Sequence, residues 1–160
     1  MAADKTEREK AQRVVADNRK AFHDYHVLET WEAGLVLLGT EIKAIREGRV
    51  NLRDSYARVD NGEVWLANVH ISPYSHSGYS SHEERRQRKL LMHTHEIRKL
   101  AGKVKEKGLT LVPLQMYFKN GRVKVTLALV KGKQAHDKRE TIRRREVDRE
   151  TRAAVKARQR

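Results

Sequence analysis

The chain has 160 residues, and its 35 Lys and Arg against 21 Asp and Glu give it a formal charge of +14. With 38% hydrophobic residues it can bury one modest core, which excludes two large domains with a catalytic cleft between them. The absence of cysteine excludes disulfides, thiolate metal sites and thiol nucleophiles.

The positive charge is unevenly distributed. Residues 131–160 hold twelve Lys and Arg and five Asp and Glu, whereas nearly all the large apolar side chains lie in the middle of the chain. We therefore expect a flexible N-terminal arm over residues 1–17, a folded body over 18–131 and a basic tail over 132–160. No run approaches the roughly 18 apolar residues of a membrane helix, and the start has no apolar signal core. A soluble cytoplasmic protein is expected.

The first predicted elements are a strand and a short helix. Residues 25–30 favour a strand that continues over 35–38, with Gly34 permitting a bend. Thr40 is expected to cap a short helix that Gly48 ends.

Two further pairs of strands are predicted, and an Asn-Gly turn separates the two strands of each pair. Asn-Gly accepts the positive φ of a tight hairpin at little steric cost, so both pairs predict β-hairpins. Pro113 cannot donate to a strand ladder, so it indicates an edge strand or a bulge. The pairs are residues 55–59 with 64–71 and residues 109–118 with 123–130.

A longer helix is predicted over about residues 93–107. Ile97, Leu100, Ala101 and Val104 form an apolar stripe at helical spacing, and Gly108 follows as a stop. With the strands, this composition favours an α+β fold that is mainly β: a small antiparallel barrel of the oligonucleotide-binding type with two or three short helices.

The tail beyond Asp137 is rich in helix formers but poor in aliphatic side chains. Ile142, Val147 and Val155 are its only aliphatic residues larger than alanine, too few to hold a helix against the body. We expect the tail to be disordered alone and helical when bound.

Catalytic and metal chemistry have weak support in the sequence. His93 and His95 are two residues apart and would point to different sides of a helix, so no metal and no cofactor are expected. No Gly-x-Ser-x-Gly motif or phosphate-binding glycine loop is present. A metal-independent ribonuclease using His23 or His26 with Glu32 is the surviving enzymatic alternative, and ordinary surface roles for these residues are more common.

Basic residues of the body lie close in sequence to aromatic and amide side chains. Structured RNA is bound by such sets, because Arg and Lys contact phosphates, Tyr and His stack on bases, and Asn bonds to base edges. Glu32 is unusual here: since phosphates repel a carboxylate, it either orients an arginine or accepts hydrogen bonds from base amino groups. The residues concerned are Asn18, Arg19, Lys20, His23, Tyr25, Glu32, Lys43, Arg46, Arg85, Arg86, Arg88 and Lys89.

Eight ordered motifs between residues 18 and 139 resemble the family of SsrA-binding proteins, also called SmpB. The motifs are Asn18-Arg19-Lys20-Ala21 with His23-Asp24-Tyr25, Glu29-Thr30 with Glu32-Ala33-Gly34, Gly39-Thr40-Glu41-Ile42-Lys43, Asn51-Leu52, Asp54-Ser55-Tyr56, Arg88-Lys89-Leu90-Leu91, Thr110-Leu111-Val112-Pro113-Leu114, and Gly132-Lys133 with His136-Asp137-Lys138-Arg139.

The resemblance implies an oligonucleotide-binding barrel that binds the tRNA-like domain of transfer-messenger RNA and delivers this RNA to stalled ribosomes. The tail would fold as a helix in the message channel near the decoding centre. The family is not enzymatic. Elongation factor Tu is a further expected partner through the alanine-charged RNA, and a monomer is expected. A constitutive ribosomal protein or a general binder of structured RNA remains the alternative.

The resemblance also assigns residues to each surface. It implies that the RNA-binding surface contains Asn18, Arg19, Lys20, Glu32, Lys43, Arg46, Lys89 and Leu91. It implies that the ribosome-binding tail contains Gly132, Lys133, His136, Asp137, Lys138 and Arg139, with the basic positions Arg143, Arg144 and Arg145 beyond them.

Overall fold

The computed structural model describes residues 12–76, 81–106, 108–133 and 135–158. This part of the chain contains nine strands and four helices. In order they are β1 (Gln12–Asp17), α2 (Arg19–Asp24), β2 (Tyr25–Leu35), α3 (Gly39–Arg46), β3 (Val50–Asn51), β4 (Tyr56–Asp60), β5 (Glu63–Ala67), β6 (His70–Ile71), β7 (Arg88–Leu91), α4 (Thr94–Val104), β8 (Leu109–Lys119), β9 (Arg122–Gly132) and α5 (Ala135–Arg158).

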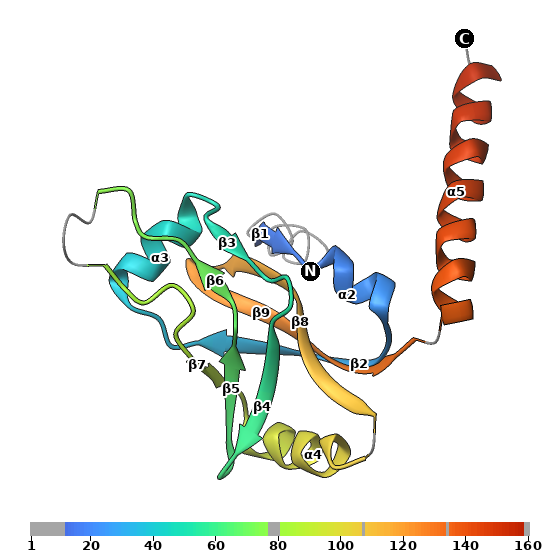
Figure 1. Ribbon diagram of the computed structural model, residues 1–160. Helices are drawn as coiled ribbons and strands as arrows, with labels where there is room; N and C mark the ends of the chain where they lie inside the picture. Colours follow the sequence, from blue (N-terminus) through green and yellow to red (C-terminus); the bar gives the residue numbers. More distant parts are fainter. Residues whose placement is uncertain (1–11, 77–80, 107, 134, 159–160) are drawn as a thin grey trace, which may run out of the picture.

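The strands pair antiparallel, and their order closes on itself. The seven-stranded sheet runs β1-β8-β4-β5-β7-β2-β9, and β9 pairs with β8 as well, so six strands form a ring (Figure 1). β3 and β6 form a separate two-stranded sheet. The expected mainly antiparallel α+β class is therefore confirmed. Assignment to the oligonucleotide-binding type stays an expectation.

Both predicted hairpins are present. β4 pairs with β5 around Asn61 and Gly62, and β8 pairs with β9 around Asn120 and Gly121. All four turn residues have positive φ, between 49° and 75°, as Asn-Gly hairpin turns require. The β8–β9 register shifts just after Pro113, which confirms the bulge alternative for this proline.

The flexible-arm prediction is wrong for residues 12–17. This segment is β1, which pairs antiparallel with β8, and its Val15 and Ala16 pack against the barrel core. β1 has only six residues, and only two of its apolar side chains face the core. Such a short apolar pattern does not identify a strand in a segment with many charged residues. Residues 1–11 lie outside the described part of the chain.

The short helices differ in detail from the predictions. α2 was not predicted, because six residues are too few to show helical periodicity. The Thr40 cap is wrong: α3 begins at Gly39 after its N-cap Leu38, and the side chain of Glu41 accepts a hydrogen bond from the Leu38 amide at 2.9 Å.

The main core fills the ring of strands and is closed by two helices. α3 contributes fully buried Ile45, and α4 contributes fully buried Leu100, with Ile97 and Val104 packed beside it. The apolar stripe predicted for the longer helix is thus confirmed, although the helix spans only Thr94–Val104. A second buried cluster lies under α2 and contains Ala21, Val112, Leu114, Ala128 and Val130.

The tail is a single helix, α5, which stands away from the barrel in Figure 1. Its three aliphatic side chains, Ile142, Val147 and Val155, are exposed, as their number led us to expect. The helical state agrees with the expected bound form, and disorder of the free tail stays a prediction. Among the described helices, none is long and apolar enough to cross a membrane.

Candidate nucleic-acid interface

A surface groove lies where β2, β7 and the start of β9 meet. Gly34 on β2 is the centre of this region, because it pairs with Leu91 on one side and with Lys124 on the other. A Cβ added to Gly34 would lie 3.3 Å from the Cβ of Leu91, a crowded contact. The glycine therefore keeps the sheet surface hollow beside an exposed leucine.

The groove combines an apolar floor with charged edges, and we call it the Leu91 groove. It consists of two adjoining hollows that share Gly34, Leu91 and Lys124. The side chain of Leu91 is 52% exposed, unusual for a leucine at the end of a central strand. The lining residues are Glu32, Gly34, Leu35, Leu37, Ile42, Leu91, Met92, His93, Glu96, Gly121, Arg122, Val123 and Lys124.

Glu32 is held on one edge of this groove by donors from β8. Its carboxylate accepts hydrogen bonds from the Tyr117 hydroxyl and from Lys119 Nζ at 3.2 Å. Partial burial would raise the pKa of Glu32, but these hydrogen bonds and the charges of Lys119 and Lys124 outweigh it and lower the pKa. Burial and the bond to Glu32 raise the pKa of Tyr117 to about 12, so the phenol is the donor. Two roles were considered for Glu32: orienting an arginine, or accepting hydrogen bonds from base amino groups. Its described partners are Tyr117 and Lys119, with no arginine among them, so the contacts do not support the first role.

Two exposed cations of α3 are positioned over aromatic rings. Lys43 Nζ lies 5.4 Å from the ring centroid of Tyr74, and the Arg46 guanidinium lies 5.9 Å from that of Phe118. Such contacts orient the side chains while leaving their outer surfaces open to solvent. Both predicted residues are therefore open to solvent, and their contact with phosphates stays a prediction.

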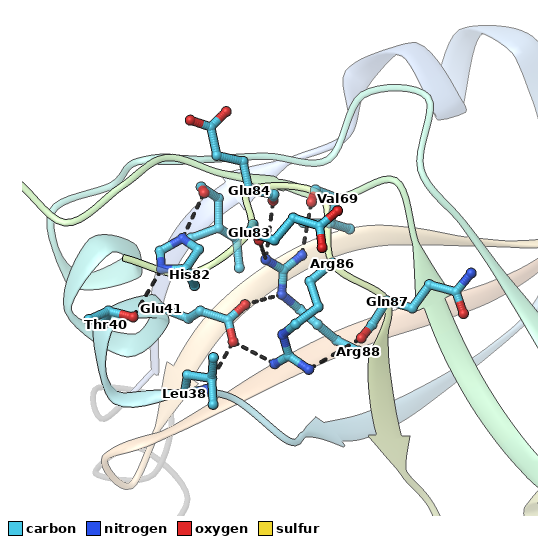
Figure 2. A network of polar contacts seen from close by, with 11 residues as sticks. Leu38, Thr40, Glu41, Val69, His82, Glu83, Glu84, Arg86, Gln87 and Arg88 are labelled. Atoms are coloured by element: carbon cyan, nitrogen blue, oxygen red, sulfur yellow. Dashed lines mark hydrogen bonds and ion pairs between the residues drawn. The ribbon is translucent and has the colours of Figure 1, made fainter. Parts of the chain in front are cut away.

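Arg88 is a correction to the predicted set. Its side chain is fully buried, with Nε donating to Glu41, Nη1 to the Val69 carbonyl at 2.9 Å and Nη2 to the Glu84 carbonyl at 3.1 Å (Figure 2). Side chains alternate along β7, so Arg88 faces inward while Lys89 and Leu91 face outward. The buried guanidinium cannot reach RNA.

The partners of Arg88 form a polar network that sequence reasoning missed. Glu41, itself fully buried, also accepts a hydrogen bond from Arg86 at 2.5 Å. Burial would raise the pKa of Glu41, but hydrogen bonds from Arg86, the Leu38 amide and Arg88 outweigh it and lower the pKa. Burial lowers the pKa of Arg88, and the bond to Glu41 opposes this. The network ties the segment after β6 to α3 (Figure 2).

Asn18 is a second correction. Only 5% of this residue is exposed, and its side chain donates to the carbonyls of Pro113 at 2.9 Å and Leu52 at 3.2 Å. Its Oδ1 accepts from the Ala21 amide at 3.2 Å, which caps α2. Since both amide N–H groups are used and the residue is buried, Asn18 positions α2 and has no donor left for a base.

Of the other predicted residues near α2, Lys20 and Tyr25 line a separate cavity, which we call the Tyr56 hollow. Lys20 Nζ donates to Asp54 at 2.6 Å, and this bond holds the pKa of Asp54 below its usual range. Arg19 is exposed and His23 is half-buried beside Asp24. The lining residues are Asn18, Lys20, Ala21, Asp24, Tyr25, Asp54, Ser55, Tyr56, Thr110 and Val112.

The start of the tail is fastened to the end of α2. Gly132 pairs with Tyr25, the Lys133 amide donates to the Asp24 carbonyl at 2.9 Å, and Lys133 Nζ donates to the Phe22 carbonyl at 3.0 Å. Further along α5 the side chains of Arg139, Arg143, Arg144 and Arg145 are exposed. The side chains of His136, Asp137 and Lys138 lie outside the described residues.

Comparison with known proteins decides the family. A model described as "SmpB protein" matches residues 15–157. A protein named SsrA-binding protein from Syntrophobacter fumaroxidans is 59% identical over 138 residues, covering 86% of each chain. The chain belongs to the SmpB family.

Other SmpB relatives extend this match over nearly their full length. The SsrA-binding protein of Carboxydothermus hydrogenoformans is 57% identical over 92% of this chain and 99% of its own. A solved structure described as "tmRNA-SmpB: a journey to the center of the bacterial ribosome" is similar with a TM-score of 0.67 and 50% identity, covering 82% of this chain and 95% of that one. Among the residues described here, no group of three or more His, Asp and Glu is placed to hold a metal ion.

Proposed function

We propose that this protein binds the tRNA-like domain of transfer-messenger RNA through the Leu91 groove and delivers that RNA to stalled ribosomes for rescue by trans-translation. The observation that carries the proposal is the 59% identity with a protein named for binding SsrA. The groove supplies the chemistry that such a partner needs.

The Leu91 groove suits an unpaired RNA loop better than a regular duplex. Exposed Leu91 gives an apolar surface on which an unstacked base can pack, and Arg122 and Lys124 supply charges for phosphates. Glu32 is ionised at neutral pH and can accept a hydrogen bond from a base amino group. Lys43 and Arg46 add further phosphate contacts from α3.

A gel-shift titration tests the proposal, with the tRNA-like domain, an ordinary tRNA and a random single strand at one salt concentration near physiological. We expect a preference for the first RNA of about a hundredfold, or about 2.7 kcal/mol. Equal binding to all three would contradict the proposal, because charge alone would then explain the affinity.

An exposed leucine outside the groove supplies a matched control. Leu91→Ser should weaken binding of the tRNA-like domain by about tenfold, whereas Leu28→Ser should leave it unchanged. The two side chains are equally exposed, at 52% and 54%, so the substitutions cost the fold similar amounts. Equal losses from both would place the RNA elsewhere.

The tail and the wider partners belong to the same proposal. The exposed arginines of α5 contact ribosomal RNA in the message channel near the decoding centre, and elongation factor Tu joins through the alanine-charged RNA. The protein acts as a monomer in the cytoplasm. Deleting residues 138–160 should leave RNA binding nearly intact while abolishing rescue, and a loss of RNA binding would contradict this division of roles.

A further inference from the structure

The outward face of α4 carries a positive surface that the fold does not use. Its inward face packs Ile97, Leu100 and Val104 against the barrel, and in Figure 1 no other element covers the opposite side. The exposed residues of this helix and its ends are His93, Thr94, His95, Arg98, Lys99, Gly102, Lys105 and Glu106. Three of them are cations and one is an acid.

The three cations have no structural role within the described chain. The side chains of Arg98, Lys99 and Lys105 make no hydrogen bond, ion pair or ring contact with any residue that the structure describes. Lys103, on the side of the helix, shows the contrast: it pairs with Glu29 and lies 5.6 Å from the ring centroid of Trp31. A cation with a structural role, such as Lys103, therefore has contacts within the fold, and the other three do not.

Gly102 lies in the middle of these cations. It is three residues from Lys99, four from Arg98 and three from Lys105, so all four share the outward face. Its backbone is helical, and a Cβ added there would have nothing within 4 Å. The fold therefore does not require glycine, although glycine is the least favourable helical residue after proline. Because glycine has no side chain, the backbone of a binding partner can approach the helix closely at this position.

The outward face adjoins the Leu91 groove at the start of α4. His93 and Glu96, at the start of α4, line that groove. The ring of His95 stacks on that of His93, with centroids 5.6 Å apart and planes at 12°. From there α4 runs for eleven residues, about 16 Å, past Gly102. RNA seated in the groove can therefore extend along the helix.

We infer that the outward face of α4 is a second contact surface for transfer-messenger RNA, on which the phosphate backbone of the bound RNA crosses Gly102 between Arg98, Lys99 and Lys105. The inference rests on the proposed function, since it extends the groove assigned to the same RNA. The cations neutralise phosphates, and the glycine removes the side chain that would hold the RNA backbone away.

Two variants of the full chain test this surface with the tRNA-like domain as the probe. Arg98→Gln/Lys99→Gln should weaken binding about tenfold and reduce the salt slope by about 0.7–0.9 for each phosphate that the variant no longer neutralises. The control Arg149→Gln/Arg152→Gln removes the same charge from exposed positions on α5 and should change neither quantity.

Gly102→Ala separates an RNA-binding role of this glycine from a structural one, because the two roles predict different changes in stability and in RNA affinity. Alanine should raise the Tm by about 2–4 °C, because it favours the helix and meets open space. The same variant should bind the tRNA-like domain about three- to tenfold more weakly. A more stable protein with weaker binding supports a close approach of RNA at this glycine.

The outcomes separate this inference from the proposed function. If wild-type protein shows no preference for the tRNA-like domain, the proposed function and this inference both fail. If Leu91→Ser weakens binding but the α4 variants bind normally, only this inference is overturned. If the α4 variants bind the tRNA-like domain normally but no longer bind ribosomes, the inference is also overturned, because α4 would then contact ribosomal RNA.

Discussion

Replacing Arg88 with methionine should destabilise the protein by about 4 kcal/mol, even though a basic residue is being removed from a strongly basic chain. Both side chains of the Arg88–Glu41 pair are fully buried. Breaking such a pair from one side costs about 3–5 kcal/mol, because the remaining charge is left without its partner in a poorly solvated site. Arg86 still contacts Glu41 and compensates part of this charge.

The backbone acceptors of Arg88 add to the cost. The carbonyl of Val69, a fully buried residue, loses its Arg88 donor, and an unsatisfied buried carbonyl costs about 1–3 kcal/mol. The carbonyls of Glu83 and Glu84 belong to exposed residues and can bind water instead. The sum stays near 4 kcal/mol, a large part of the roughly 5–15 kcal/mol that stabilises a typical domain.

Urea unfolding followed by circular dichroism measures this loss. Glu41→Gln/Arg88→Met should recover at least about 1 kcal/mol relative to Arg88→Met, because the buried carboxylate, which Arg86 compensates only in part, is gone. At a temperature where Arg88→Met remains folded, it should bind RNA with wild-type affinity. A loss of stability below about 1 kcal/mol with weakened RNA binding would refute the buried assignment.

Three other predictions concern the cap of α2, Glu32 and the tail. Asn18→Ala should lower the free energy of unfolding by about 2 kcal/mol, as measured in urea, because two buried carbonyls and a helix amide lose their partner; a loss below about 0.5 kcal/mol would contradict it. The lowered pKa of Glu32 stabilises the fold above its unfolded pKa near 4.5, and this stabilisation is lost as the pH falls through the folded pKa. Tyr117→Phe removes one cause of that shift, so its stability should fall less between about pH 5 and 3 than that of wild type; identical acid limbs would refute the hydrogen bond. Circular dichroism of free protein with and without residues 132–160 should show less helix than the 24 residues of α5 supply, and a full helical difference would contradict disorder of the free tail.

Local features of the barrel were predictable because their signals lie close together in the chain. Asn61-Gly62 and Asn120-Gly121 each specify a turn by backbone conformation alone, and the flanking strands follow. The stripe that ends at Val104 specifies the buried face of α4 in the same way. β1 and α2, six residues each, were missed because their stability comes from packing on β8, far along the chain.

The sequence by itself determined the positive charge of the protein, its two hairpins, its longer internal helix and the helical character of its tail, all of which follow from composition or from residues within a few positions of one another. Only the tertiary structure decided that Arg88 and Asn18 are buried and that Gly34, Leu91 and Lys124 meet in one groove. These outcomes depend on which strands pair and which face of each strand turns inward. Strand pairing and facing are determined by the burial of the whole core, and so they cannot be predicted from any one segment of the sequence.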